Sequence, residues 1–186
     1  MMFDLFAPYP IIISLISILL NIIIAIAGIL PSTFVTLGTV SALNLNFAII
    51  ILIIGEAAGA IISFTLYRKG LQKLSAFPRF NKLENRYLSK LKESDGAHAF
   101  FIVIFLRVLP FVPSGIVTLT AAISKLKVLP FSIASTAGKI PAIMIEAYSV
   151  VYFLTLGVEW QILVGVVILF IYLIYLTFKK SFRKSR

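Results

Sequence analysis

Cysteine is absent from this chain of 186 residues, and histidine occurs once, at His98. Without cysteine the chain can form no disulfide and has no thiolate to act as a nucleophile or metal ligand. The sequence also lacks an HExxH pattern, a serine–histidine pair and a cluster of metal-ligating residues, which are common signatures of hydrolases and metalloenzymes. We therefore expect no enzyme activity, no metal and no other cofactor.

Acidic residues are also scarce: seven stand against 17 lysines and arginines, which gives a net charge of +10. In a soluble protein such an excess would indicate nucleic acid as a partner. Here, however, 60% of the residues are hydrophobic, the mean hydropathy is +1.06, and the basic residues lie in two blocks beside long apolar runs. This distribution follows the positive-inside rule. We predict an all-α, polytopic integral membrane protein whose partners are membrane lipids and not nucleic acid.

Two apolar segments precede the first basic block. Residues 10–30 supply the roughly 20 residues that one crossing needs, so residues 1–30 are predicted to contain the first transmembrane helix. Residues 31–46 are uncharged and rich in threonine, but as a helix they would reach only about 24 Å, short of the roughly 30 Å hydrocarbon core. They are interpreted as a re-entrant hairpin that turns near Gly38, with an ordinary external loop as the alternative. Residues 47–67 form the second predicted span.

Residues 68–96 form a hydrophilic, mostly basic loop. Within it, apolar residues recur at spacings of three and four after Pro78, which suits the start of a helix; they are Phe80, Leu83, Tyr87 and Leu91. The pattern predicts either a helix lying on an anionic membrane surface or a solvated linker.

The next apolar run, residues 99–123, contains one charged residue, Arg107, and two prolines, Pro110 and Pro113. Proline removes a backbone donor, so this pair is expected to break a helix that enters from residue 99. A charge near mid-membrane is costly, and broken backbone at that depth survives only when it is buried in protein or lines a cavity. A buried cation on a broken helix suits an anion-binding site. The alternative is a kinked span in which Arg107 pairs with a carboxylate for structural reasons.

The basic residues also constrain the number of crossings. The loop at 68–96 and the C-terminal tail are both basic, so both are expected in the cytoplasm, with an even number of crossings between them. Three apolar stretches separate them, at 99–123, 128–157 and 161–178, so one of these does not cross. The proline-broken stretch is the best candidate. It makes residues 99–124 a second hairpin, 128–157 a span, and 158–186 the last span with its basic tail.

This arrangement has about four full spans and two oppositely oriented re-entrant hairpins that form an inverted repeat, with both termini in the cytoplasm. Transporters bind substrate at the interface of such repeats, near the midplane. The ionisable groups of the apolar stretches are expected to meet there without net charge; they are Glu56, Arg107, Lys139 and Glu146. The predicted substrate-binding residues are Arg107, Pro110, Pro113, Ser114 and Lys139, and the predicted proton- or ion-coupling residues are Glu56 and Glu146. Helix packing is predicted at Gly55, Gly59, Ser63, Gly138 and Pro141.

Three motifs follow one another along the chain: Gly55-Glu56-x-x-Gly59 leading to Phe64 and Arg68, then Phe105-x-Arg107-x-x-Pro110, then Gly138-x-x-Pro141. Over about residues 28–157 the sequence resembles the DedA superfamily, also called the VTT-domain or SNARE-associated Golgi protein family. The resemblance implies a core, residues 31–157, with two facing re-entrant hairpins, and movement of lipids across bilayers. Bacterial relatives are linked to translocating undecaprenyl phosphate, and eukaryotic relatives to scrambling phospholipids.

Two positions depart from the family pattern. Many bacterial members have a second arginine where this chain has Pro113, and the acidic residue often found in the first hairpin is replaced around Ser32-Thr33. These differences bear against undecaprenyl phosphate as the substrate and against proton coupling, and bear less on the fold.

The leading hypothesis for function is a lipid translocator or scramblase of a bacterial plasma membrane, in which Arg107 contacts the lipid phosphate. Proton coupling and assembly into a homo-oligomer are left open. One alternative is a proton-coupled transporter of a small ion, with Glu56 or Glu146 as the carrier. Another is a membrane protein with a purely structural role.

Overall fold

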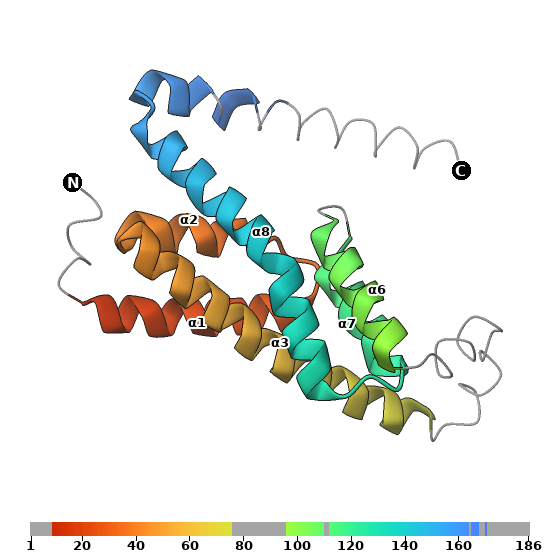
Figure 1. Ribbon diagram of the computed structural model, residues 1–186. Coiled ribbons are helices and arrows are strands. Elements are labelled where there is room, and N and C mark those ends of the chain that lie inside the picture. The colour runs from red at the N-terminus through yellow and green to blue at the C-terminus, as the bar shows by residue number, and fades with distance from the viewer. Residues whose placement is uncertain (1–8, 76–95, 110–111, 164, 168–169, 171–186) are drawn as a thin grey trace.

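The computed structural model describes residues 9–75, 96–109, 112–163, 165–167 and 170, and the regular elements of this part are all helices. They are α1 (Pro10–Ala27), α2 (Thr33–Ala42), α3 (Leu45–Ser75), α6 (Gly96–Val108), α7 (Ser114–Ile123) and α8 (Val128–Thr155), drawn in Figure 1, with a further short apolar helix over Val158–Val167. α1, α3 and α8 are long and apolar enough to cross a membrane. The all-α fold is confirmed, and its apolar helices are those of a polytopic membrane protein.

Some predicted features lie outside the described residues. They are the amphipathic segment after Pro78, most of the last span, the basic C-terminal tail and the segment before Tyr9.

α1 buries its polar side chains and exposes its apolar ones. Its buried residues are Ser14, Ser17 and Asn21, whereas Ile11 is 74% exposed. In water this pattern would be unfavourable, because large apolar side chains would contact solvent. In a bilayer it is the expected one, since lipid tails solvate isoleucine and leucine while polar side chains hold helices together.

The chain reverses direction between α1 and α2, and again between α2 and α3 at residues 43–44. α1 is capped by Gly28, whose φ of 71° lies in the left-handed region that glycine adopts readily. α2 then runs back along α1, and the hydroxyl of Thr39 donates to that of Ser17 at 2.9 Å. The turn predicted near Gly38 is wrong, because α2 is helical on both sides of this residue. α1 and α2 are the arms of the first helical hairpin in the structure, whereas the hairpin predicted from the sequence spans residues 31–46.

A second helical hairpin is made by α6 and α7, which lie side by side (Figure 1). α6 ends at Val108 and α7 begins at Ser114, so the helix is interrupted where the prolines predict a break. Pro113 immediately precedes α7, where its fixed φ suits the start of a helix and its missing N–H costs no intrahelical bond.

The long helices α3 and α8 pack against each other in antiparallel directions at the centre of the molecule (Figure 1). Phe64 of α3 stacks on Phe131 near the start of α8, with ring centroids 4.6 Å apart. Glu56, which precedes Phe64 in α3, contacts Lys139, which follows Phe131 in α8, so the two helices run in opposite directions. Two apolar clusters pack along this pair of helices. One surrounds Phe64 and Phe131 and includes residues of α6 and α7, and the other includes residues of α2. The second hairpin is therefore docked at one end of the pair, and α2 near the other.

Glycines allow close helix contacts at two of these packing surfaces. A Cβ added to Gly59 would lie 2.8 Å from the Cβ of Ala25 in α1, and one added to Gly138 would lie 2.7 Å from the Cβ of Arg107 in α6. Larger residues would push these helices apart. The remaining predicted packing residues are Gly55, which faces α1, Ser63, which is fully buried, and Pro141, which is exposed within α8.

Candidate functional site

Three ionisable side chains meet where α3, α6 and α8 converge: Glu56, Arg107 and Lys139. Glu56 and Arg107 are only 4% and 7% exposed. One carboxylate oxygen of Glu56 accepts from Arg107 Nη1 at 3.4 Å, and the other accepts from Lys139 Nζ at 2.8 Å. Each cation therefore approaches a carboxylate, as a charge inside a membrane is expected to do, and both approach the same one.

The guanidinium of Arg107 also connects the two arms of the second hairpin. Arg107 lies in the last turn of α6, where the helix dipole favours a positive charge. Its Nη2 donates to Thr118 Oγ1 of α7 at 3.3 Å, and the Thr118 hydroxyl donates to the Ser114 carbonyl at 2.9 Å. Arg107 Nε is buried without a hydrogen-bond partner among the described residues. A buried donor left without a partner is costly.

The cluster carries more positive than negative charge, because two cations share one carboxylate. The sequence predicts that Glu146 joins the cluster and neutralises it. The structure instead places the Glu146 carboxylate against the hydroxyl of Thr36 in α2, which donates to it at 2.9 Å. The seven residues from Lys139 to Glu146 span about 10 Å along α8, so a shared helix face does not make them neighbours. The prediction of a neutral cluster is wrong, and the excess positive charge suits an anion.

The turns of the two hairpins meet beside this cluster. The backbone N–H of Gly115 donates to the carbonyl of Gly28 at 2.8 Å, and the hydroxyl of Ser114 donates to the same carbonyl at 3.4 Å. A Cβ on Gly28 would lie 2.6 Å from the Cα of Gly115, so the contact requires glycine. Tyr67 of α3 donates its hydroxyl to the carbonyl of Ile26 at 2.9 Å and fixes the end of α1. The cluster therefore lies near the point where both hairpins reverse.

A second arginine, Arg68 of α3, holds the other end of α7. Its Nε donates to the carbonyl of Ala122 at 3.2 Å, and its Nη2 donates to the carbonyls of Ala121 at 3.3 Å and Ser124 at 2.8 Å. The guanidinium carbon lies 4.4 Å from the centre of the Phe64 ring, a cation–π contact. The last carbonyls of a helix lack intrahelical donors. Arg68 supplies them, and so fixes the second hairpin against α3.

The predicted substrate-binding residues are only partly brought together. Arg107 and Lys139 both contact Glu56. The carbonyl of Ser114 accepts a hydrogen bond from Thr118, which in turn accepts one from Arg107. Pro113 is exposed in front of α7, and Pro110 lies outside the described residues.

Sequence reasoning missed several buried hydroxyl and amide side chains of α1, α2 and α7. Thr118 is one, and its signal was its position one helical turn after Ser114. The others are Ser14, Ser17, Asn21, Thr36 and Thr39. Their spacing of three or four residues within otherwise apolar runs places each group on one helix face. A polar face on an apolar helix indicates the side that meets other helices.

The family model of the VTT domain matches residues 30–152 of the chain, a range that contains Glu56, Arg107, Lys139 and Glu146. The sequence is also 27% identical over 146 residues to the membrane protein YhjE of Bacillus subtilis, described as uncharacterized, in a match that covers 78% of this chain and 69% of YhjE. No solved structure matches the chain. Because the family model covers more than half of the sequence, the chain belongs to the VTT-domain (DedA/SNARE-associated) family of membrane proteins.

Proposed function

We propose that this protein moves a phosphate-bearing lipid between the leaflets of a bacterial plasma membrane, as a translocator or scramblase without enzyme activity. The observation that carries the proposal is the excess positive charge of the buried cluster, in which Arg107 and Lys139 share the single carboxylate of Glu56. A lipid phosphate would supply the missing negative charge. The protein's family membership and its apolar exterior support a lipid as the transported molecule.

The geometry around Arg107 supports phosphate as the ligand group. A guanidinium offers five donors in a planar fork that matches the oxygens of a phosphate. Arg107 uses Nη1 for Glu56 and Nη2 for Thr118, while Nε is unpaired within the described structure. The side chain of Lys139 is 19% exposed, so this second cation is accessible to a headgroup that approaches the cluster. Glu56 holds both cations in place.

We also propose that the helices form an inverted repeat in the membrane. A helical hairpin followed by one long helix occurs twice, as α1–α2–α3 and α6–α7–α8, and the two long helices run in opposite directions. α6 and α7 have 13 and 10 residues, about 20 Å and 15 Å of helix, which is short of the roughly 30 Å hydrocarbon core. Their hairpin would therefore enter and leave on the same side, as a re-entrant hairpin.

The contact between Gly28 and Gly115 supports the same membrane depth for the end of α1 and for this turn. With α1 ending there, α1 and α2 form the opposite re-entrant hairpin, and the full spans are α3, α8 and the segment after Val158. This arrangement replaces the predicted four spans and puts the segment before α1 outside. That segment contains no lysine or arginine, as the positive-inside rule expects of an external segment. The C-terminal tail stays in the cytoplasm.

Reconstituted vesicles test the lipid function. The protein is inserted into vesicles with a trace of NBD-labelled phosphatidylglycerol or of NBD-labelled glucosylceramide, which has no phosphate, and dithionite reports which molecules reach the outer leaflet. Arg107→Ala should slow movement of the phosphate-bearing lipid by about tenfold or more, since a hydrogen bond to a charged group contributes about 1.5–3 kcal/mol. Arg107→Lys keeps the charge but loses the fork, so it should be intermediate.

Lys73→Ala serves as a control, because it removes an exposed cation elsewhere on α3. It should leave the rate unchanged. A structural role for Arg107 predicts instead that stability in detergent falls together with activity. Full transport of phosphatidylglycerol by a stable Arg107→Ala protein would end the phosphate-site proposal.

A proton-coupled transporter of a small ion is the second candidate. The observation in its favour is Glu146, a half-buried carboxylate that accepts a hydrogen bond from Thr36 and takes no part in the buried cluster. A pH gradient across the same vesicles separates the two functions. Ion uptake that follows the gradient, is lost in Glu146→Gln and occurs without lipid movement would support this candidate over the first.

A further inference from the structure

Thr118 lies in the middle of α7, a helix that is held at both ends. At its start, the N–H of Gly115 donates to the carbonyl of Gly28 in the preceding hairpin. At its end, three carbonyls accept hydrogen bonds from Arg68 of α3. Thr118 itself is 1% exposed. Because α7 is fixed on both sides of it, the Thr118 hydroxyl has a defined position beside the buried cluster.

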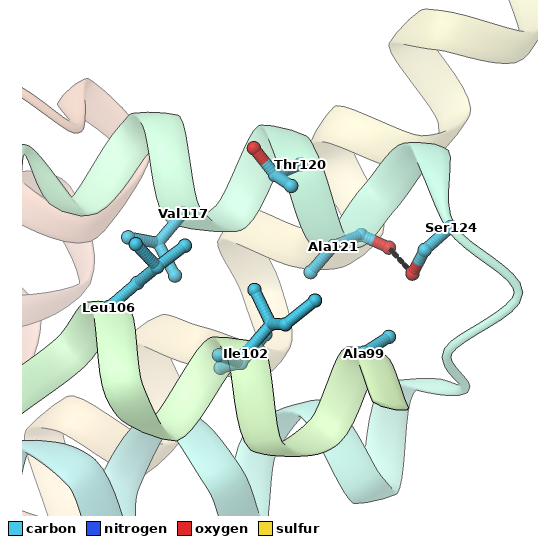
Figure 2. Close-up of a pocket in the computed structure, with 8 residues that line it drawn as sticks. Ala99, Ile102, Leu106, Val117, Thr120, Ala121 and Ser124 are labelled. Carbon is cyan, nitrogen blue, oxygen red and sulfur yellow. Dashed lines mark hydrogen bonds between the residues drawn. The ribbon is translucent and has the colours of Figure 1, made fainter. Parts of the chain in front are cut away.

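The seam between α6 and α7 is apolar beside the point where Arg107 and Thr118 meet. Figure 2 shows Leu106 of α6 and Val117 of α7, which directly precede these two residues in sequence, together in this seam. In the described part of the chain, the side chains of the two arms share one hydrogen bond, from Arg107 Nη2 to Thr118 Oγ1 at 3.3 Å. The hydroxyl is therefore the acceptor that α7 offers to the guanidinium.

The donor and acceptor roles in this contact are fixed. The single hydrogen of the Thr118 hydroxyl is donated to the carbonyl of Ser114 at 2.9 Å, and a guanidinium has donors only. Thr118 must therefore accept from Arg107. Donation to a carbonyl also polarises the hydroxyl oxygen and strengthens it as an acceptor. Valine has nearly the same shape as threonine but cannot take this role.

Arg107 is shared between Thr118 on one side and Glu56 on the other. Its contact with Glu56 is 3.4 Å long and uses Nη1 alone, whereas Lys139 binds the other carboxylate oxygen at 2.8 Å. Hydrogen bonds between charged groups are usually about 2.7–2.9 Å long, so the contact of Arg107 with Glu56 is stretched. A guanidinium released by Thr118 would be free to turn and bind this carboxylate with two parallel N–H groups. Its charge would then be spent on Glu56.

We infer that Thr118 is a positioning residue: it keeps the Arg107 guanidinium from forming a two-point pair with Glu56 and so leaves it available to a lipid phosphate. The inference rests on the lipid-moving function proposed above and deepens it. Arg107 contacts the phosphate, and Thr118 acts through Arg107. The second hairpin thereby controls the anion affinity of the cluster.

Three variants test this role in the vesicles described above. Thr118→Val removes the hydroxyl and should slow movement of NBD-labelled phosphatidylglycerol by about tenfold, the factor to which the weaker hydrogen bonds to charged groups correspond. Thr118→Ser keeps the hydroxyl and should keep most of the rate. Thr120→Val makes the same change two residues further along α7, where Figure 2 shows the hydroxyl directed away from α6, and should leave the rate unchanged.

A second measurement reports anion binding without lipid movement. A ligand that binds only the folded protein raises its unfolding temperature. In detergent, dioctanoyl-phosphatidylglycerol should raise the unfolding temperature of the wild type and of Thr118→Ser, whereas dioctanoylglycerol, which has no phosphate, should not. Thr118→Val should lose this shift while its unfolding temperature without lipid stays close to that of the wild type, because Glu56 takes up the released N–H. A merely structural role predicts the reverse: a lower unfolding temperature and a retained shift.

The outcomes separate this inference from the proposed function. A wild-type rate and a wild-type shift in Thr118→Val would overturn the positioning role, while movement that depends on Arg107 would leave the translocator standing. A slow rate that Thr118→Ser does not restore, or an equal shift with both short-chain lipids, would also overturn it. A phosphate-dependent shift that requires both Thr118 and Arg107, without movement of any lipid, would support the positioning role and contradict the translocator.

Discussion

Glu56 is the side chain on which the buried cluster depends, since both Arg107 and Lys139 bind to it. Glu56→Gln removes the only negative charge that either cation contacts within the described structure. We expect this variant to lower the free energy of unfolding by about 3–5 kcal/mol, the usual cost of removing one partner of a buried ion pair while the other stays charged. Thermal or denaturant unfolding in detergent measures the loss, with Glu159→Gln as a control because Glu159 is exposed.

The double variant Glu56→Gln with Lys139→Gln separates charge from packing. It leaves one unpaired cation where the single variant leaves two, so it should recover part of the lost stability. Wild-type stability in Glu56→Gln alone would show that the cations do not need this carboxylate. The argument from excess positive charge to a bound anion would then fail.

Part of the site was predictable from the sequence because a charge within an apolar run is rare and costly. On this ground Glu56, Arg107 and Lys139 were identified. Because a buried cation requires a partner, Arg107 and Lys139 were predicted to contact a carboxylate. The same reasoning failed for Glu146, because helix periodicity gives the face on which a residue lies and not which neighbouring helix covers that face. Thr118 was missed because a threonine within an apolar helix can bond its own backbone, as this one does to Ser114, so its presence alone signals nothing.

At the scale of helices, hydropathy predicted where apolar segments occur but not where the chain reverses. The long helices α3 and α8 and the break before α7 follow from run length and from proline chemistry. The turn of the first hairpin was placed wrongly because residues 11–30 contain neither a charge nor a proline and were taken as one span. The reversal depends on Gly28, whose left-handed backbone ends α1 three residues before Pro31, a helix-stop pattern, and whose contact with a distant glycine leaves no local pattern. Gly38, by contrast, is helical.

These two glycines give a matched test of the first hairpin. Gly28→Ala would hold alanine at a φ of 71° and push its Cβ to 2.6 Å from the Cα of Gly115. We expect a loss of stability well above the roughly 1–2 kcal/mol that left-handed backbone alone costs. Gly38→Ala meets nothing within 4 Å and lies inside α2, so it should be neutral or stabilising by up to about 1 kcal/mol. Unfolding in detergent compares the two, and equal stabilities would contradict the described turn.

At the scale of the whole molecule, the orientation of α1 depends on how its end is held. Run length alone allows α1 to cross the membrane, as predicted from the sequence. The hydrogen bond from Gly115 to Gly28 instead joins the end of α1 to the turn of the second hairpin. In the proposed arrangement the short hairpin does not reach the far surface, so its turn and the end of α1 would both lie within the bilayer. A tertiary contact that no pattern in α1 encodes thus supports the proposal that α1 does not cross the membrane.

Labelling of single cysteines tests this orientation, because the native chain has none that would interfere. A membrane-impermeant maleimide added to intact cells should label Asp4→Cys and Glu159→Cys. It should label Ser181→Cys and Asp95→Cys only after permeabilisation, since the basic loop and tail are expected in the cytoplasm. Asp4→Cys is the discriminating position. If it alone is protected, α1 crosses the membrane and the chain has the four spans that run length predicts. If Ser181→Cys is labelled from outside, an odd number of spans follows the basic loop, and the re-entrant assignment of α6 and α7 fails with it.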